Sequence, residues 1–217
     1  MRIVNRQVGE QNFHVFYQII CGASDEERDA WNISPDVSDY ILLASNAGKQ
    51  GEQSAEELTE DQIEEYKQDF MRLKDSLKEL KFEEEVVDML FSIIAGLLHL
   101  GQVQFDTVFD NGEEGCQVSD ISSLELAASL CGFSSDELVN VLTNRTVTSR
   151  SETFSKKLSK KQSIKARDAI AKIIYKLLFS WLTKEVNLQI KLANKVSAAQ
   201  KIWMQGTVVM LVLVSVM

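Results

Sequence analysis

One uninterrupted stretch, residues 159–194, constrains the fold more than any other feature of the sequence, because it contains neither proline nor glycine. It opens with Ser159 and Gln162 in the spacing of a capping box, in which two side chains satisfy orphan backbone N–H groups at a helix start. A helix of this length extends on the order of 50 Å. The stretch therefore predicts a long helix that crosses a whole domain, with an apolar stripe formed by Ile164, Ala169, Ile170, Ile173, Leu177, Trp181 and Leu182.

The rest of the chain also favours helices. It has 217 residues, of which 45% are hydrophobic and 25% charged, and this is the composition of an ordinary globular protein. Pro35 is the only proline and there are ten glycines, so the turn residues that a many-stranded fold needs are scarce. The sequence predicts a mainly α fold with a few short strands. Further helices are expected over residues 10–21, 24–31, 59–80, 82–100, 120–131 and 135–143, the first ended by Gly22 and the fourth by Gly101.

One of these helices and four short segments carry additional predictions. The helix over 82–100 is apolar on nearly every side, which predicts burial all round. Residues 102–105 alternate like a short strand, and the Asp-Asn-Gly sequence at 110–112 predicts an exposed acidic turn. Residues 145–154 alternate and are rich in β-branched side chains, so a hairpin is expected there. The valine-rich tail, 206–217, has the pattern of a fully buried strand.

Charge is distributed unevenly along the chain. The formal net charge is -9, yet residues 145–176 hold ten Lys and Arg against Glu152 and Asp168, a local charge of +8. The acidic total argues against bulk attraction to nucleic acid or anionic lipid. The basic segment has only Phe154 and Tyr175 as stacking aromatics, which disfavours single-stranded nucleic acid. Two interpretations stay open: a solvated helix face with a hairpin, or a surface for an acidic protein.

No complete catalytic, cofactor or metal site is predicted. The only Gly-Lys pair, Gly48-Lys49, lies between Leu43 and Gln50 where a phosphate-binding P-loop needs glycine and a hydroxyl side chain, and no Asp-x-x-Gly occurs. The two histidines, His14 and His99, are far apart in apolar helical segments, so we interpret them as packing residues. The carboxylate runs at 56–57 and 83–85 fit solvated charges at helix starts.

The sequence also predicts a location. Cys21, Cys116 and Cys131 form no Cys-x-x-Cys pair and are odd in number, which favours a reducing compartment. Residues 1–12 lack the apolar core of a signal peptide, and no apolar run reaches the roughly 20 residues of a membrane-spanning helix. We therefore expect a cytoplasmic protein with no membrane span.

Three segments together resemble one family. They are GEQNFHVFYQ at 9–18, IAGLLHLG at 94–101, and ARDAIAK at 166–172 running on to LFSWL at 178–182. In this order and at these separations they resemble the motor domain of a myosin, in the later part of its upper 50 kDa region. The resemblance covers about residues 2–195. It implies a partial P-loop-type motor domain over residues 1–196 that lacks most of its central sheet.

The resemblance also implies partners and sites. In the family, the P-loop and both switch loops lie outside the part that this chain matches, so ATP and Mg²⁺ belong to the intact parent, and this chain holds no catalytic, cofactor or metal residue. Residues 145–158 match the position of the cardiomyopathy loop, a surface loop that faces actin. By position, Arg145, Arg150 and Glu152 are expected to touch actin, while Lys156 and Lys157 supply a positive field. The implied partners are the actin filament and the remainder of the myosin heavy chain, in the cytoskeleton.

The sequence departs from the family pattern after about Val196. Residues 198–203 lead into the valine-rich tail, and the Asp-x-x-Gly-Phe-Glu type of switch does not follow the long helix. We expect residues 197–217 to lie outside the family pattern, from an incomplete or mis-spliced gene model. The alternative hypothesis is a stand-alone helical interaction module that binds an acidic protein through the basic 145–176 surface.

Overall fold

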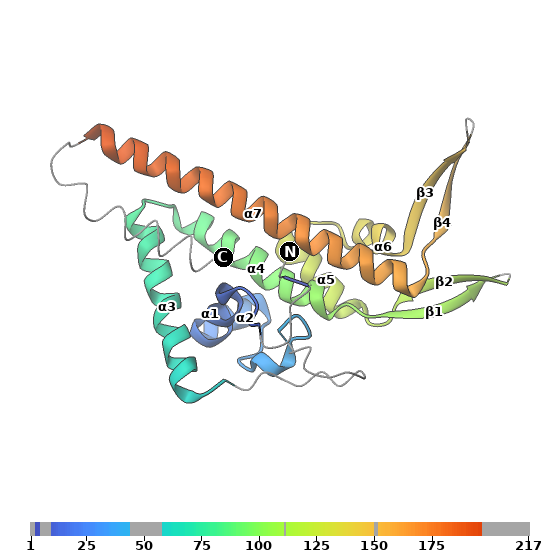
Figure 1. The fold of residues 1–217 in the computed structure, drawn as a ribbon, viewed down its shortest axis with the longest axis horizontal. Helices are drawn as coiled ribbons and strands as arrows, with labels where there is room; N and C mark the ends of the chain where they lie inside the picture. The colour runs from blue at the N-terminus through green and yellow to red at the C-terminus, as the bar shows by residue number, and fades with distance from the viewer. Residues whose placement is uncertain (1–2, 5–9, 44–57, 111, 150–151, 197–217) are drawn as a thin grey trace.

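The longest helix, α7 (Lys160–Val196), runs along the length of the molecule, and the other elements are arranged along it (Figure 1). Its 37 residues correspond to about 55 Å at 1.5 Å per residue, so the predicted domain-crossing helix is confirmed. The computed structural model describes residues 3–4, 10–43, 58–110, 112–149 and 152–196. The other elements in these ranges are α1 (His14–Gly22), α2 (Asp25–Trp31), the 3₁₀ helix η1 (Val37–Asp39), α3 (Glu60–Glu79), α4 (Glu84–Gln102), α5 (Ile121–Cys131), α6 (Ser135–Thr143) and the strands β1 (Phe105–Asp110), β2 (Glu113–Val118), β3 (Asn144–Ser149) and β4 (Glu152–Lys157).

Helix α4 lies beside α7 and runs antiparallel to it (Figure 1). At one end, Arg167 of α7 donates to the carbonyl oxygens of Gly101, at 3.3 Å, and Val103, at 2.9 Å. At the other end, Phe82 meets Trp181 edge to face, with ring centroids 6.4 Å apart. The inward face of α7 is buried from Ala171 to beyond Trp181; its members are Ala171, Tyr175, Leu178, Leu182 and Val186.

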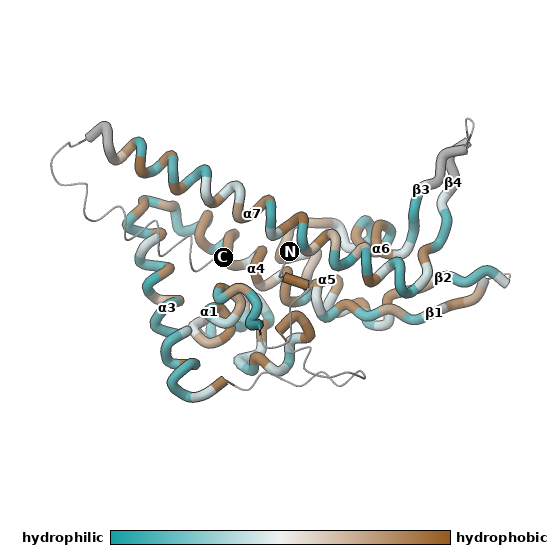
Figure 2. Tube along the Cα trace, viewed as in Figure 1, coloured by the Kyte–Doolittle hydropathy of each residue, from teal (hydrophilic) through white to brown (hydrophobic). Residues whose placement is uncertain are grey.

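The burial of α4 is uneven, which corrects the expectation of a helix buried all round. From Leu90 onward most of its side chains are buried, and they include Phe91, Ile94, Leu97 and Leu98. Its first turns face solvent, and Met89 is 49% exposed. Figure 2 shows the same change from hydrophilic to hydrophobic residues along the helix. Coverage by α5 and α7, which periodicity does not report, decides which turns are buried.

The two glycines that were predicted to end helices both lie where two segments pack closely together. Gly101 does not end α4, because the helix continues through Gln102. A Cβ atom on Gly101 would lie 3.1 Å from the Cβ of Leu42. Gly22 is the last residue of α1, as expected, but its Cβ would lie only 2.5 Å from the Cβ of Phe70 on α3. Glycine at these positions therefore allows close contact between segments.

The N-terminal helices form a layer against α4 and α7. Tyr17 of α1 stacks on Tyr66 of α3, with ring centroids 5.3 Å apart, and Phe13 stacks on Tyr175 of α7 at 4.6 Å. Capping boxes are present at Thr59, which begins α3, and at Ser24, which begins α2. The helices expected over residues 24–31 and 59–80 are thus confirmed.

A fully buried amide holds the entry to α1. The side-chain nitrogen of Asn12 donates to the carbonyl oxygens of Ile3, at 3.0 Å, and Leu42, at 2.9 Å. Its side-chain oxygen accepts from the backbone N–H of Phe13, and its own backbone N–H donates to the Tyr17 hydroxyl. Because every one of these groups is paired, a buried polar side chain is tolerated and joins three chain segments.

The strands form two antiparallel hairpins that project from one end of the molecule (Figure 1). The hairpin of β3 and β4 confirms the expectation for 145–154 and extends it to Lys157. The hairpin of β1 and β2 corrects the short strand expected at 102–105, because residues 102 and earlier belong to α4 and the strand begins at Phe105. Of the turn predicted at 110–112, Asn111 lies outside the described residues, while Gly112, just before β2, has a φ of 83°. The prediction for the valine-rich tail lies outside the described residues.

The contact at Gly22 yields a stability prediction. Gly22→Ala places a methyl group against the backbone-proximal atoms of Phe70, which cannot rotate away, so α1 and α3 must separate. We expect a loss of about 1–3 kcal/mol in the free energy of unfolding. Urea unfolding followed by circular dichroism measures it. Ser129→Ala, at an exposed position of α5, is the control and should change stability little; equal stabilities of the two variants would contradict the packing argument.

A buried histidine yields a pH prediction. Nε2 of His99 lies 2.9 Å from the carbonyl oxygen of Trp31, as expected of a donor, and burial lowers the pKa of His99 below its usual value of 6.5. The folded protein then binds fewer protons than the unfolded chain, so stability is complete above about pH 6.5 and falls as pH decreases toward the lowered pKa. The slope is at most about 1.4 kcal/mol per pH unit.

Urea unfolding at pH 7, 6 and 5 measures this slope. His99→Gln should remove it, while His14→Gln, at an exposed position, should retain it. Hydrogen bonds from nearby Ser residues or the backbone lower the pKa values of three carboxyl groups, those of Glu26, Asp36 and Asp120. The change in stability that their protonation causes therefore falls below this pH window. An unchanged slope in His99→Gln would assign the pH dependence to another group.

Candidate functional site

The β3–β4 hairpin is held at its base by two helices. Strand β3 follows α6 directly, since Thr143 ends the helix and Asn144 begins the strand. At the other side, the backbone N–H of Leu158 donates to the carbonyl oxygen of Thr143 at 2.8 Å. The Gln162 side chain then accepts from the Ser159 backbone N–H at 3.0 Å, as the predicted helix start requires. The hairpin is therefore fixed in direction by α6 and α7.

Two of the predicted actin-facing residues sit opposite each other on this hairpin. Arg145 and Lys156 are cross-strand partners in the register, and both side chains are exposed. Neither is in an ion pair within the described ranges. Like charges directly opposite each other on two strands repel and destabilise the pair. Their positive charge is therefore available to an external anionic group.

The structure describes the other three predicted actin-facing residues to different extents. Lys157 is exposed at the end of β4. The methylene groups of its side chain pack on Gly115 of the neighbouring hairpin, so closely that a Cβ on Gly115 would lie 2.8 Å from the Cδ of Lys157. Glu152 begins β4 and pairs with Ser149, but its side chain is outside what the structure describes. Arg150 lies entirely outside the described residues.

The sequence did not predict the acidic hairpin that lies beside the basic one. Strands β1 and β2 carry the exposed acids Asp106, Glu113 and Glu114, and Phe109 is 75% exposed. The two hairpins contact each other through β2 and β4. The Asp-Asn-Gly sequence at 110–112 was the available signal, because neither 105–110 nor 113–118 alternates strictly between apolar and polar residues. A basic and an acidic ribbon thus project together from the same end (Figure 1).

The basic segment continues on the first turns of α7. Lys160, Lys161 and Lys165 are exposed there, whereas Arg167 is turned inward. Arg167 pairs with Asp168 at 2.8 Å in addition to its two carbonyl acceptors. The local charge of 145–176 is therefore divided between a surface patch and one structural cation.

The histidines and thiols have structural roles. His99 is buried and its Nε2 bonds to the carbonyl oxygen of Trp31, so it packs between helices as interpreted. His14 is exposed on α1, where its ring approaches that of Tyr66 with centroids 6.0 Å apart. Cys21, Cys116 and Cys131 are free thiols. Burial raises the pKa of Cys21 to about 11 and that of Cys131 to about 12, which leaves both protonated at neutral pH and weakly nucleophilic.

The described ranges contain no group of three or more His, Cys, Asp or Glu side chains that could hold a metal ion. Residues 48–49, the Gly-Lys pair, lie outside these ranges. None of the helices in the part of the chain that the structure describes has the length and hydrophobicity of a membrane-spanning segment.

The segments that carried the family resemblance form one packing unit. Residues 9–18 supply Phe13, which stacks on Tyr175 of α7. Residues 94–101 end at the carbonyl group of Gly101 that accepts from Arg167, a residue of the third segment. Segments separated by more than sixty residues in the sequence thus meet directly, which is what a shared fold requires of them.

Comparisons with known proteins point to the same family as these three segments. A family model described as "Myosin head (motor domain)" matches residues 1–203. The chain is 30% identical over 182 residues to "Chitin synthase 5" of Cryptococcus neoformans, covering 84% of this chain and 9% of that protein. It is 32% identical over 191 residues to "Myosin-52" of Schizosaccharomyces pombe, covering 86% and 11%.

Human "Unconventional myosin-Ib" is 30% identical over 197 residues, which cover 90% of this chain and 16% of that protein. The chain thus spans a minor part, 9% to 16%, of the length of these relatives. The family match covers most of the sequence and includes all three packed segments. The chain belongs to the myosin head (motor domain) family.

Proposed function

We propose that this chain is part of an actin-based, ATP-dependent myosin motor, in which it supplies helical scaffold and one actin-contact hairpin. The observation that carries the proposal is the exposed Arg145–Lys156 pair on a hairpin anchored by α6 and α7. Family membership supports it, since the relatives include "Myosin-52" and "Unconventional myosin-Ib". The proposed partners are the actin filament and the remaining parts of the heavy chain, in the cytoplasmic cytoskeleton.

Electrostatics supports the hairpin as the contact. An exposed pair of positive charges accelerates the encounter with an acidic filament and fixes its orientation, more than it adds to final affinity. Lys156 and Lys157 extend the positive field along β4. Arg150 and Glu152, near the connection between the strands, are proposed as direct contacts. The nearby acids of β1 and β2 confine the positive potential to the β3–β4 side of this end.

The nucleotide is assigned to the rest of the motor. The sequence has no P-loop motif and no Asp-x-x-Gly switch motif, and the described side chains form no metal cluster. The residues present therefore do not fit ATP with Mg²⁺. In this proposal the chain contributes a rigid body, α4 with α7 and α1, that holds the hairpin in place relative to the parent motor.

A second candidate function is a stand-alone helical module that uses the basic 145–176 surface on an acidic protein. One observation favours it: the buried apolar residues, from Ile3 to Val186, belong to one core cluster among the described residues. A soluble monomer with a sharp, cooperative thermal transition would support this candidate. Aggregation of the isolated chain through exposed apolar surface would support the motor fragment instead.

The actin contact predicts a charge-specific effect. Arg145→Glu combined with Lys156→Glu should weaken co-sedimentation with actin filaments by about tenfold or more at low salt, because attraction becomes repulsion. Lys67→Glu combined with Lys78→Glu changes the net charge equally on exposed positions of α3. This control should bind like the original chain. Equal weakening by both pairs would indicate a nonspecific charge effect and would reject the hairpin as the contact.

The nucleotide assignment predicts no turnover by the chain alone. Phosphate release from ATP with Mg²⁺ should stay at background, with or without actin filaments, because the residues that hold phosphate and metal are missing from the sequence. An intact myosin motor assayed in parallel provides the positive control. Actin-stimulated turnover by the 217-residue chain would overturn this part of the proposal.

A further inference from the structure

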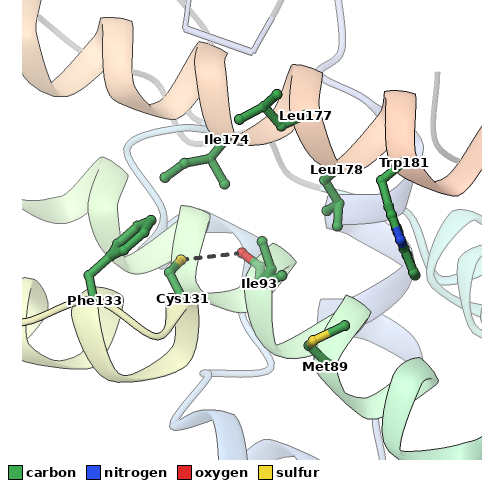
Figure 3. Close-up of a pocket in the computed structure, with 8 residues that line it drawn as sticks. All are labelled: Met89, Ile93, Cys131, Phe133, Ile174, Leu177, Leu178 and Trp181. Atoms are coloured by element: carbon green, nitrogen blue, oxygen red, sulfur yellow. Dashed lines mark hydrogen bonds between the residues drawn. The ribbon is translucent and has the colours of Figure 1, made fainter.

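An open pocket of about 300 Å³ lies between α4, the end of α5 and α7 (Figure 3). Met89 and Ile93 of α4 form one side, Cys131 and Phe133 another, and Leu177 and Trp181 of α7 close over them. None of its lining residues is charged. The Cys131 thiol is directed toward the carbonyl oxygen of Ile93, at 4.0 Å. The pocket therefore offers an apolar side chain a place away from water.

The apolar surface continues from the pocket along α7 toward its C-terminal end. Leu188 and Leu192 are 46% and 47% exposed. At about 100° per residue, they lie within roughly 60° of Leu177 and Trp181 around the helix axis. Ile173, 57% exposed, lies one turn of α7 before the pocket residue Leu177. We call the pocket and these three residues the α7 groove.

The α7 groove collects most of the uncovered apolar side chains of the described ranges. Eleven large hydrophobic residues are exposed there, and six of them belong to the groove or its rim: Met89, Phe133, Ile173, Leu177, Leu188 and Leu192. Single exposed apolar residues are ordinary, but a continuous apolar surface marks a place where something binds.

One segment of this chain matches the groove in chemistry. Residues 206–217 lie outside the described residues, and nine of the twelve are valine, leucine or methionine. No charged side chain follows Lys201, so burial of this segment desolvates no charged side chain. Each such side chain gains about 1.5–3 kcal/mol when it is fully buried. The segment also lies beyond residue 203, where the match to the family ends.

The segment also starts near enough to reach the groove. Helix α7 ends at Val196, and Trp181 lies fifteen residues back along it, or about 22 Å. The nine residues 197–205 span up to about 30 Å when extended. The chain can therefore reverse after α7 and bring residues 206–217 alongside Leu192, Leu188 and the pocket.

We propose that residues 206–217 bind in the α7 groove and place an apolar side chain in the pocket lined by Cys131, Phe133 and Trp181. The tail would thus cover apolar side chains of α4 and α7 that are otherwise exposed. The inference does not depend on the proposed actin contact, which lies at the opposite end of α7 (Figure 1).

Disulfide mapping in the full chain tests the proposal, because Cys131 lies in the pocket and the tail contains no cysteine. Val209→Cys, Val212→Cys and Ser215→Cys are prepared as three single variants and oxidised at low protein concentration. At least one should form an intramolecular disulfide with Cys131 as its major product, identified by peptide mass spectrometry. Cys21 on α1 is the internal control and should not be linked. Major linkage to Cys21, or linkage only between chains, would overturn the proposal.

Truncation after Gln205 gives a second, independent readout. Without the tail, alkylation of Cys131 by N-ethylmaleimide should accelerate about tenfold relative to Cys21 in the same molecule, since thiol reactivity follows exposure. Cys116 is 4% exposed and serves as the reporter of unfolding. An unchanged Cys131 rate with Cys116 still protected would contradict the proposal. If truncation unfolds the chain and exposes Cys116, the disulfide map in the full chain decides.

Discussion

The packing of α7 against α4 is the contact on which the rest of the structure depends. Arg167 fixes one end of the pair by donating to the carbonyl oxygens of Gly101 and Val103, at the point where α4 leaves its helical path. Hydrogen bonds from a charged donor contribute about 1.5–3 kcal/mol each, and the acceptors stand at the negative end of the α4 dipole. The aromatic contact of Phe82 with Trp181 fixes the other end.

This pair of helices also explains how a surface hairpin can be positioned for recognition. Strand β4 leads into α7 with only Leu158 and Ser159 between them, so the direction of the helix sets the direction of the ribbon. The helix is in turn held by α4 and by the stacking of Phe13 on Tyr175. A rigid support lowers the conformational entropy that a binding loop loses on contact, which is why recognition elements on scaffolded loops are effective.

Local sequence rules predicted where helices begin better than which parts of a helix are buried. Helices were expected from residues 24 and 59, and both are present. The capping boxes that begin them, at Ser24 and Thr59, join neighbours three residues apart, so they form wherever the helix forms. The surroundings of α4 depend on which helices cover it. Periodicity could not show that Met89 faces the open groove, or that Gly101 lies inside the helix against Leu42. The hairpin at 144–157 was predictable, but its position beside an acidic hairpin was not.

By itself, the sequence determined the mainly helical fold, the long helix after Ser159, the basic 145–176 segment and the three segments that indicate the family. These features rest on local periodicity, capping and composition, which need no knowledge of distant partners. Only the tertiary structure decided that Arg167 is a structural cation while Arg145 and Lys156 face solvent, although all three belong to the same basic segment. The physical reason is that a charge is placed by what packs around it, and that depends on contacts between residues far apart in the chain.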